Sequence, residues 1–163
     1  MMIKNSHVNP QKMIDVTVDL QVAVDDDSCP TLLQFEAWAS ALCQFLSIKV
    51  MQVSLRLVDA IEGKQLNQQW RNKPNATNVL SFPFEMPEVE LNFLGDIVLC
   101  VPVVLEEAQQ QQKTVEAHFA HLWCHGLLHL LGYDHVESQD AMKMEQQEIE
   151  IMQRLGYSNP YDD

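Results

Sequence analysis

The chain has 163 residues, of which 47% are hydrophobic, and it carries 23 Asp and Glu against 10 Lys and Arg. This size and apolar content suffice for one buried core and exclude a disordered or collagen-like chain, so we expect a single domain over residues 1–163. The net charge of −13 repels polyanions and disfavours a free-standing nucleic-acid-binding surface. No apolar run reaches the roughly 18 residues of a membrane helix, and the first residues lack the order of a signal peptide. We therefore expect a cytoplasmic protein that does not engage a membrane.

Hydrophobic periodicity predicts an α+β domain with a small sheet of about four strands and about five helices. The predicted elements, in chain order, are a strand over 13–22, a helix over 31–46, a strand over 50–58, a helix over 59–69, strands over 77–82 and 94–101, a helix that begins at Pro102, and helices over 115–131 and 139–154. The acidic turn at 25–27 is expected to begin the first helix, because carboxylates favour a helix N-terminus. The second helix is expected to turn Ile61, Leu66 and Trp70 inward.

Five of the six histidines fall between positions 118 and 135. His125 and His129 are spaced one helical turn apart, so their side chains share one face of the predicted helix. Gly132 predicts a chain reversal that carries His135 back toward this pair. Three imidazoles on one centre, with positions left for water, are typical of a catalytic zinc site. The sequence therefore predicts about one Zn²⁺ per chain, bound by a long helix and the turn after it.

The spacing of these histidines also equals that of a metallopeptidase motif, H-E-x-x-H-x-x-G-x-x-H. Peptidases of this class need a Glu directly after the first His, as general base on the zinc-bound water. Gly126 occupies that position here and cannot accept a proton through a side chain. Peptide hydrolysis is therefore disfavoured.

Further candidates flank the three histidines. Arg71 lies in a loop-like stretch and carries a guanidinium that can hold a phosphate through two hydrogen bonds; a solvated loop charge is the alternative. His121 lies one helical turn before His125 and could orient a ligand or relay a proton; a structural role is the alternative. Asp134 could support a ligand or act on a proton, or could simply be a turn residue. Cys124 is about 100° around the helix from His125 and is excluded as a ligand.

The sequence resembles the YbeY family of endoribonucleases, bacterial single-domain metalloproteins linked to ribosomal RNA maturation. The resemblance covers most of residues 50–157 and is carried by NQQWR (67–71), TNVLSFP (77–83), LGDI (94–97), HLWCHGLLHLLGYDH (121–135) and the tail from Met144 to Tyr157. The sequence departs from the family at Asn78, where many members carry Asp.

The resemblance implies that His125, His129 and His135 bind the metal and that Arg71 faces the metal cleft. It implies a zinc-dependent endoribonuclease, a phosphodiester hydrolase specific for single-stranded RNA. The implied role is 3′-end processing of small-subunit ribosomal RNA, with ribosome biogenesis and ribosome quality control. The implied partners are single-stranded rRNA, the small ribosomal subunit with its proteins, and a ribosome-associated GTPase. Delivery by such partners would reconcile an acidic protein with an RNA substrate.

Two other functions fit the residues. One is a metal-dependent hydrolase of a small anionic substrate, and the other is a non-catalytic ribosome assembly factor in which zinc only stabilises the fold. Structural zinc sites are normally closed by four protein ligands, which disfavours the second alternative because the pattern offers three. Water, His121 and Asp134 all remain candidates for the general base, and either water or the 2′-hydroxyl of the RNA could attack the phosphate.

Overall fold

The computed structural model describes residues 14–85, 92–133 and 138–162. Its elements, in chain order, are β1 (Asp15–Ala23), α1 (Leu32–Leu46), β2 (Val50–Val58), α2 (Ala60–Arg71), β3 (Val79–Pro83), β4 (Phe93–Cys100), α3 (Val101–Gln110), α4 (Val115–Leu130) and α5 (Ser138–Arg154). The predicted α+β architecture, with a four-stranded sheet and five helices in one domain, is confirmed.

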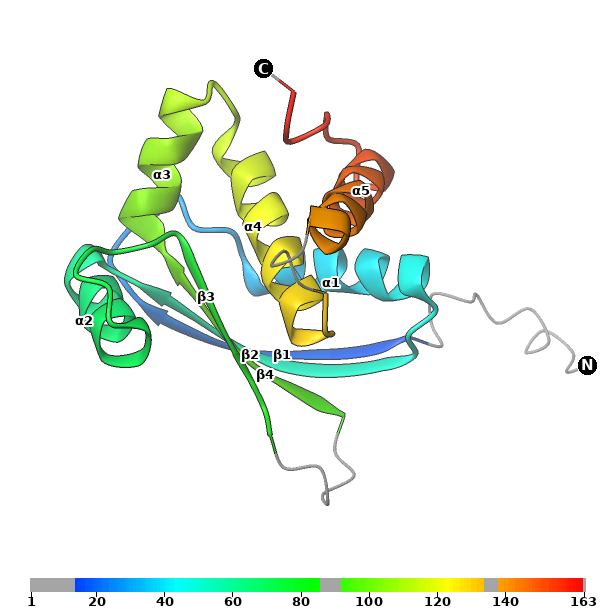
Figure 1. Ribbon diagram of the computed structural model, residues 1–163, viewed down its shortest axis with the longest axis horizontal. Coiled ribbons are helices and arrows are strands. Elements are labelled where there is room, and N and C mark those ends of the chain that lie inside the picture. The colour runs from blue at the N-terminus through cyan, green and yellow to red at the C-terminus, as the bar shows by residue number, and fades with distance from the viewer. Residues whose placement is uncertain (1–13, 86–91, 134–137, 163) are drawn as a thin grey trace, which may run out of the picture.

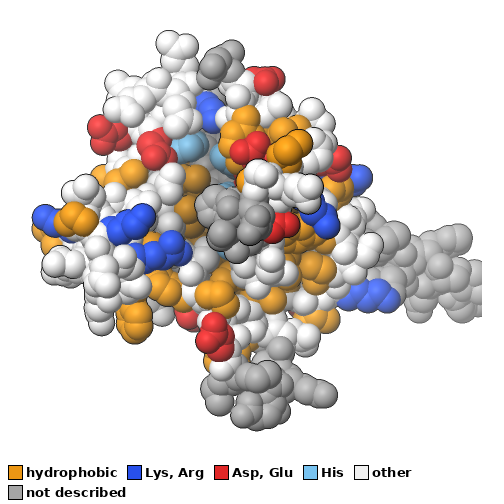
Figure 2. Space-filling view, viewed as in Figure 1, with side chains coloured by type: hydrophobic (Ala, Val, Ile, Leu, Met, Phe, Trp, Pro, Cys, Tyr) orange, Lys and Arg blue, Asp and Glu red, His pale blue; other side chains and the backbone are white. Residues whose placement is uncertain are grey.

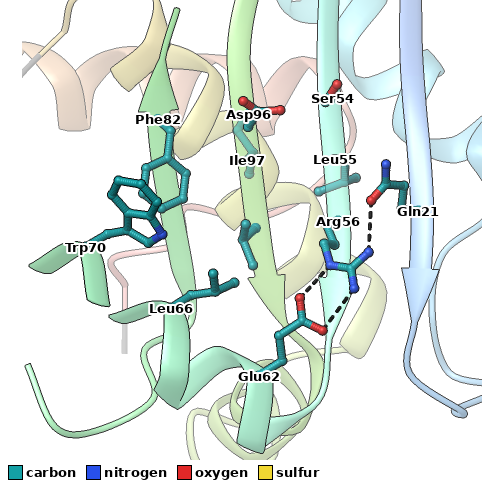
Figure 3. Close-up of a pocket in the computed structure, with 11 residues that line it drawn as sticks. Gln21, Ser54, Leu55, Arg56, Glu62, Leu66, Trp70, Phe82, Asp96 and Ile97 are labelled. Carbon is teal, nitrogen blue, oxygen red and sulfur yellow. Dashed lines mark hydrogen bonds and ion pairs between the residues drawn. The ribbon is translucent and has the colours of Figure 1, made fainter. Parts of the chain in front are cut away.

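The strands lie in the order β1-β2-β4-β3. β1 pairs with β2 and β2 with β4 in parallel, whereas β3 pairs with β4 in the antiparallel direction. β3 is thus an edge strand, which agrees with its ending at Pro83, because proline cannot donate a backbone hydrogen bond to a neighbour. Helices α1, α4 and α5 lie over one face of the sheet (Figure 1), and α2 lies over the other face (Figure 3).

Successive residues of the central strands point to opposite faces of the sheet and pack in two different apolar clusters. In β4, Ile97 and Leu99 belong to the main core beneath α1 and α4, whereas Val98 and Cys100 belong to a smaller cluster that includes Leu66 of α2. β2 alternates in the same way, since Met51, Val53, Leu55 and Leu57 are all buried in the main core. The main core holds α4 firmly against β3 and β4, and α4 carries the predicted metal-binding histidines.

Threonine side chains cap the starts of α1 and α4. The Thr31 hydroxyl accepts from the backbone N–H of Gln34 at 3.2 Å, and the Gln34 side chain accepts from the N–H of Thr31 at 2.9 Å. Thr114 caps α4 in a similar way through the N–H of Ala117. The expectation that the acidic residues 25–27 begin α1 was wrong, because the first turn of α1 contains no carboxylate and Thr31 provides the cap.

The prediction for α2 was also wrong in part. Ile61 and Trp70 are 70% and 62% exposed, so neither points into a core. α2 instead buries Gly63 and Asn67, and a β-carbon on Gly63 would lie 2.8 Å from Cys100 Sγ. The small residue allows the helix to approach β4 closely, which leaves its larger apolar side chains on the solvent side.

Of the four cysteines, Cys43, Cys100 and Cys124 are buried and Cys29 is partly buried, and all four are free thiols. Within the described ranges, no helix has both the length and the apolar character needed to cross a bilayer.

Candidate metal centre and its surroundings

The histidine pair lies on α4 as predicted. The ring centroids of His125 and His129 are 4.6 Å apart, and the ring planes meet at 78°. Both side chains extend from one face of the helix near its C-terminal end, so two nitrogen donors lie within reach of one ion. Gly132 adopts φ +100, and the N–H of Tyr133 donates to the carbonyl of Leu128 at 3.0 Å. The predicted chain reversal after α4 is therefore present.

A carboxylate from α5 contacts this histidine face. Glu148 is 0% exposed, and one of its oxygens, Oε1, is hydrogen-bonded to Nδ1 of His125. The other oxygen, Oε2, lies 2.7 Å from Nε2 of His121 and also accepts from the hydroxyl of Tyr161. One buried side chain thus joins α4, α5 and the C-terminal tail.

The charge state of Glu148 follows from these neighbours. Burial alone raises the pKa of a carboxyl group, but hydrogen bonds from His121 and His125 outweigh that effect and lower the pKa of Glu148 to about 2. Glu148 is therefore an ionised acceptor at neutral pH, and the two ring nitrogens that face it act as donors. A proton on Nδ1 of His125 leaves the lone pair of that ring on Nε2.

The chemistry of these residues fits a zinc ion. Metal-binding histidines almost always donate their second ring N–H to a carboxylate, a carbonyl or water, and His125 does so to Glu148. The third predicted ligand, His135, and the neighbouring candidate Asp134 lie outside the described residues. In the ranges that the structure describes, no group of three His, Cys, Asp or Glu side chains comes together in a way that could hold a metal. The three-histidine site therefore stays a prediction.

Tight packing explains why glycine follows His125. A β-carbon on Gly126 would lie 3.0 Å from Cδ1 and 3.3 Å from Cγ2 of Ile97, and 3.3 Å from Oγ of Ser81. The Ser81 hydroxyl donates to the Gly126 carbonyl at 3.5 Å. This position faces the sheet, and a glutamate there would project into β3 and β4. The peptidase arrangement is thus incompatible with the packing of α4.

Arg71 is the last residue of α2 and is exposed, whereas the sequence suggested a loop position. The helix ends because Asn72 adopts a left-handed conformation with φ 56. The buried Asn67 side chain then holds the following loop, since its Nδ2 donates to the carbonyl of Asn75 at 2.5 Å. This loop places Lys73, also exposed, two residues beyond Arg71.

Cationic and histidine side chains appear on the same face of the molecule. Figure 2 shows Lys and Arg side chains gathered at the left, over α2, and histidine side chains nearer the centre of that face. The exposed cations of α2 and the loop after it are Lys64, Arg71 and Lys73. This local positive charge contrasts with the overall charge of −13 and gives a polyanion a place to approach.

His118 lies on α4 away from the histidine pair and forms a buried contact with Glu107. Its ring is 3% exposed, and Nε2 lies 2.9 Å from Oε1 of Glu107. Asn78 donates through Nδ2 to the same carboxylate at 3.0 Å. An Asp at position 78 would instead place two carboxylates side by side, so the departure from the family at Asn78 suits its local partner. Burial lowers the pKa of His118, although Glu107 acts in the opposite direction.

Cys124 is fully buried, as expected for a residue excluded from the metal site, and burial raises the pKa of its thiol far above the ordinary value. Its side chain packs in the main core, about 100° around α4 from that of His125, so it does not face the proposed ion.

A cavity of about 470 Å³ lies elsewhere, on the sheet face that carries α2. Its polar centre is Arg56, which donates to Glu62 at 2.5 and 3.0 Å and to Gln21 at 2.9 Å (Figure 3). None of the histidines in the described part of the chain lines this cavity. Because its guanidinium is already bonded to a carboxylate, Arg56 is not a phosphate-binding group.

Sequence reasoning missed Glu148 and Tyr161. A signal for Glu148 was present, because it lies in the apolar stripe of α5 formed by Met144, Ile151 and Met152, all buried. A glutamate in such a stripe must find buried partners. Tyr161 lies beyond the last predicted helix, where no periodicity pointed to a contact.

Comparisons with known proteins agree with the fold and with the family resemblance seen in the sequence. The family model described as endoribonuclease YbeY matches residues 21–156. A protein of Alteromonas mediterranea named endoribonuclease YbeY is 43% identical over 151 residues, which cover 89% of this chain and 96% of that protein. One of Colwellia psychrerythraea with the same name is 47% identical over 148 residues, with 88% and 96% covered. A solution structure of a Thermotoga maritima protein is similar with a TM-score of 0.56 and 26% identity, over 90% of this chain and all of that one. This chain belongs to the YbeY family of endoribonucleases.

Proposed function

We propose that this chain is a zinc-dependent endoribonuclease that cleaves single-stranded ribosomal RNA during maturation of the small ribosomal subunit in the cytoplasm. The observation that supports the proposal most directly is the pairing of His125 and His129 on one face of α4, with the buried Glu148 bonded to His125. The names of the relatives support the nuclease activity.

In this proposal, His125, His129 and His135 hold the metal. A bound zinc ion would supply Lewis-acid polarisation of a phosphate oxygen and lower the pKa of a coordinated water. Arg71 binds the scissile phosphate with its guanidinium and stabilises the charge that develops there. Gly126 has no side chain that could act as a general base, so another group must do so, and His121, Asp134 and water are the candidates.

The acidic surface supports a role for protein partners. With a net charge of −13, long-range attraction to free RNA is weak, and the cations around Arg71 provide few phosphate contacts. We therefore propose that the small subunit and its proteins, together with a ribosome-associated GTPase, bring the RNA to the site and raise its effective concentration there. Ribosome quality control would use the same activity on defective particles.

The test is incubation of zinc-loaded protein with single-stranded ribosomal RNA, with a duplex of the same sequence and the His129→Ala variant as controls. We expect cleavage of the single strand by the parent protein alone. Equal cleavage by His129→Ala would contradict the metal assignment, and cleavage of the duplex would contradict single-strand specificity. Hydrolysis of small phosphodiesters, with no RNA cleavage, would instead favour a small anionic substrate.

A further inference from the structure

We infer that Glu148 is a positioning residue for His125 and that Tyr161, from the C-terminal tail, secures Glu148 in that role. The inference rests on the proposed function, because it assigns these residues to the metal centre proposed there. It adds residues from α5 and from the tail to a site that the sequence motif places on α4 and the turn after it.

The first step of the argument is the direction of the contact. Nδ1 of His125 faces Oε1 of Glu148, so the carboxylate fixes the proton on Nδ1. A neutral imidazole with its proton on Nδ1 presents its lone pair from Nε2, which is the form needed to bind an ion from that nitrogen. Without the carboxylate, the ring can adopt either tautomer and can rotate.

The second step is the burial of Glu148. Its side chain is 1% exposed, whereas those of His121 and His125 are 11% and 22% exposed. A buried carboxylate is tolerated only when hydrogen-bond donors satisfy both oxygens. Oε1 accepts from His125, and Oε2 accepts from His121 and Tyr161. The position of Glu148, and through it that of His125, depends on this set of three donors.

The third step concerns the tail that supplies Tyr161. The ring of Tyr161 packs edge-on against that of His121, with centroids 5.5 Å apart and planes at 84°. Lys113 Nζ donates to the carbonyl of Pro160 at 2.5 Å, and the N–H of Tyr161 donates to Oδ1 of Asn159 at 2.8 Å. These contacts tie the tail to the start of α4, so the hydroxyl of Tyr161 is held against Glu148.

The main test is the zinc affinity of Glu148→Gln, measured by competition with a metal-sensitive dye. Glutamine has a similar shape but one accepting oxygen, so it cannot accept from both histidines. We expect zinc affinity to fall about 10- to 100-fold, the usual effect of removing such a partner. The matched control is Glu107→Gln, which alters a carboxylate that contacts His118 on the same helix, and its zinc affinity should equal that of the parent protein.

The second readout requires no metal and no RNA. Nitrogen-15 NMR of the histidine rings in metal-free protein should show the His125 proton on Nδ1 in the parent chain and in Glu107→Gln. In Glu148→Gln the same ring should show a mixture of tautomers. A structural role for Glu148 alone would lower the melting temperature without changing this tautomer.

Tyr161→Phe keeps the carboxylate and tests the inference even if Glu148→Gln fails to fold. It should weaken zinc binding by less than about 10-fold, because His121 and His125 still bond to Glu148. Tyr157→Phe is its control, since the Tyr157 hydroxyl donates to Glu116 at 2.7 Å, outside this cluster. Loss of affinity in Tyr161→Phe but not in Tyr157→Phe supports the inference.

These experiments distinguish a failure of this inference from a failure of the proposed metal site. Parental zinc affinity and an unchanged His125 tautomer in Glu148→Gln would overturn this inference, as would equal affinities of the two tyrosine variants. Parental zinc affinity in His125→Ala would overturn the metal site of the proposed function instead.

Discussion

Gly126 lies so close to Ile97 that a β-carbon at position 126 would be 3.0 Å from Ile97 Cδ1. Ile97 is fully buried in β4 and cannot move outward without disturbing the main core. Gly126, which follows His125, thus lets α4 pack closely on the sheet. A side chain at this position would face away from the metal-binding side of the helix.

This packing predicts the outcome of Gly126→Glu, which completes the metallopeptidase motif. We expect a loss of stability of at least about 3 kcal/mol, because the substitution both overpacks the core and buries an unpaired charge. Denaturant unfolding measures the loss, and a protein-digestion assay tests for peptidase activity. A stable variant that digests protein would contradict both the packing argument and the exclusion of peptide hydrolysis.

The three predicted ligands can be tested by metal content. His125→Ala, His129→Ala and His135→Ala should each lose the zinc that the parent chain holds, about one ion per chain, when measured by elemental analysis. Cys124→Ala is the control and should retain the ion, because the Cys124 side chain is buried in the core. Retention of zinc by all three histidine variants would refute the ligand assignment.

Arg71→Ala should keep its zinc and its melting temperature but lose most RNA cleavage. Arg71 is exposed at the end of α2, so its removal leaves no buried group unsatisfied. Arg71→Lys should recover little activity, because one ammonium group cannot reproduce a two-pronged phosphate contact. Lys49→Ala, which removes an exposed cation outside α2 and the loop after it, is the control. Full activity in Arg71→Ala would show that Arg71 is only a solvated surface charge, whereas unfolding of the variant would show that Arg71 stabilises the fold.

The buried ring of His118 predicts a pH dependence of stability. Burial lowers its pKa in the folded protein, while in the unfolded chain the ring protonates near pH 6.5. Below about pH 6.5 the unfolded state therefore binds more protons than the folded state, and the free energy of unfolding decreases as pH falls. The contribution of this group is at most about 1.4 kcal/mol per pH unit.

The measurement is urea unfolding of chelator-treated protein at pH 7.5 and pH 5.5, for the parent chain and for His118→Gln. We expect the parent chain to lose more stability than the variant over this interval. Glu148 does not interfere, because its pKa of about 2 keeps it charged at both pH values. Equal losses in both proteins would show that His118 does not titrate differently on unfolding.

The net charge predicts weak binding to naked RNA. Few phosphates are neutralised by Lys64, Arg71 and Lys73, so the slope of log affinity against log salt should be shallow, about one to three. Binding to small-subunit particles should be tighter than binding to naked small-subunit rRNA, as measured at the same salt concentration. Tight and steeply salt-dependent binding to naked RNA would contradict delivery by ribosomal partners.

The fold was largely predictable because its strands and helices carry clear periods. The alternation over 50–58 matches β2 in both bounds, and the helix predicted over 115–131 matches α4 to within one residue. The errors concern where the first helix begins and which side chains the second helix buries. Ile61 and Trp70 look like core residues on a short helix, but the close approach of Gly63 to β4 decides which face of α2 is covered.

The candidate site was predictable to the extent that it is local in sequence. His125, His129 and Gly132 lie within a few residues of one another, so helix geometry alone relates them. Glu148 is 23 residues beyond His125, and its contact depends on how α5 packs on α4. Tyr161 reaches the same carboxylate through a tail without regular periodicity. Only tertiary structure brings these side chains together.

The three tryptophans lie in environments of different solvent exposure, so fluorescence can follow two regions of the protein separately. Trp123, two residues before His125, is fully buried and donates to the carbonyl of Phe35 at 3.0 Å, and Trp38 is 6% exposed. Trp70 is 62% exposed and precedes Arg71. While the core is intact, a water-soluble quencher reaches Trp70 alone, so the quenchable emission of Trp70 reports on ligands that approach Arg71. The emission of Trp38 and Trp123 is shielded from the quencher until the helices that carry the histidines unfold, so it reports on that unfolding.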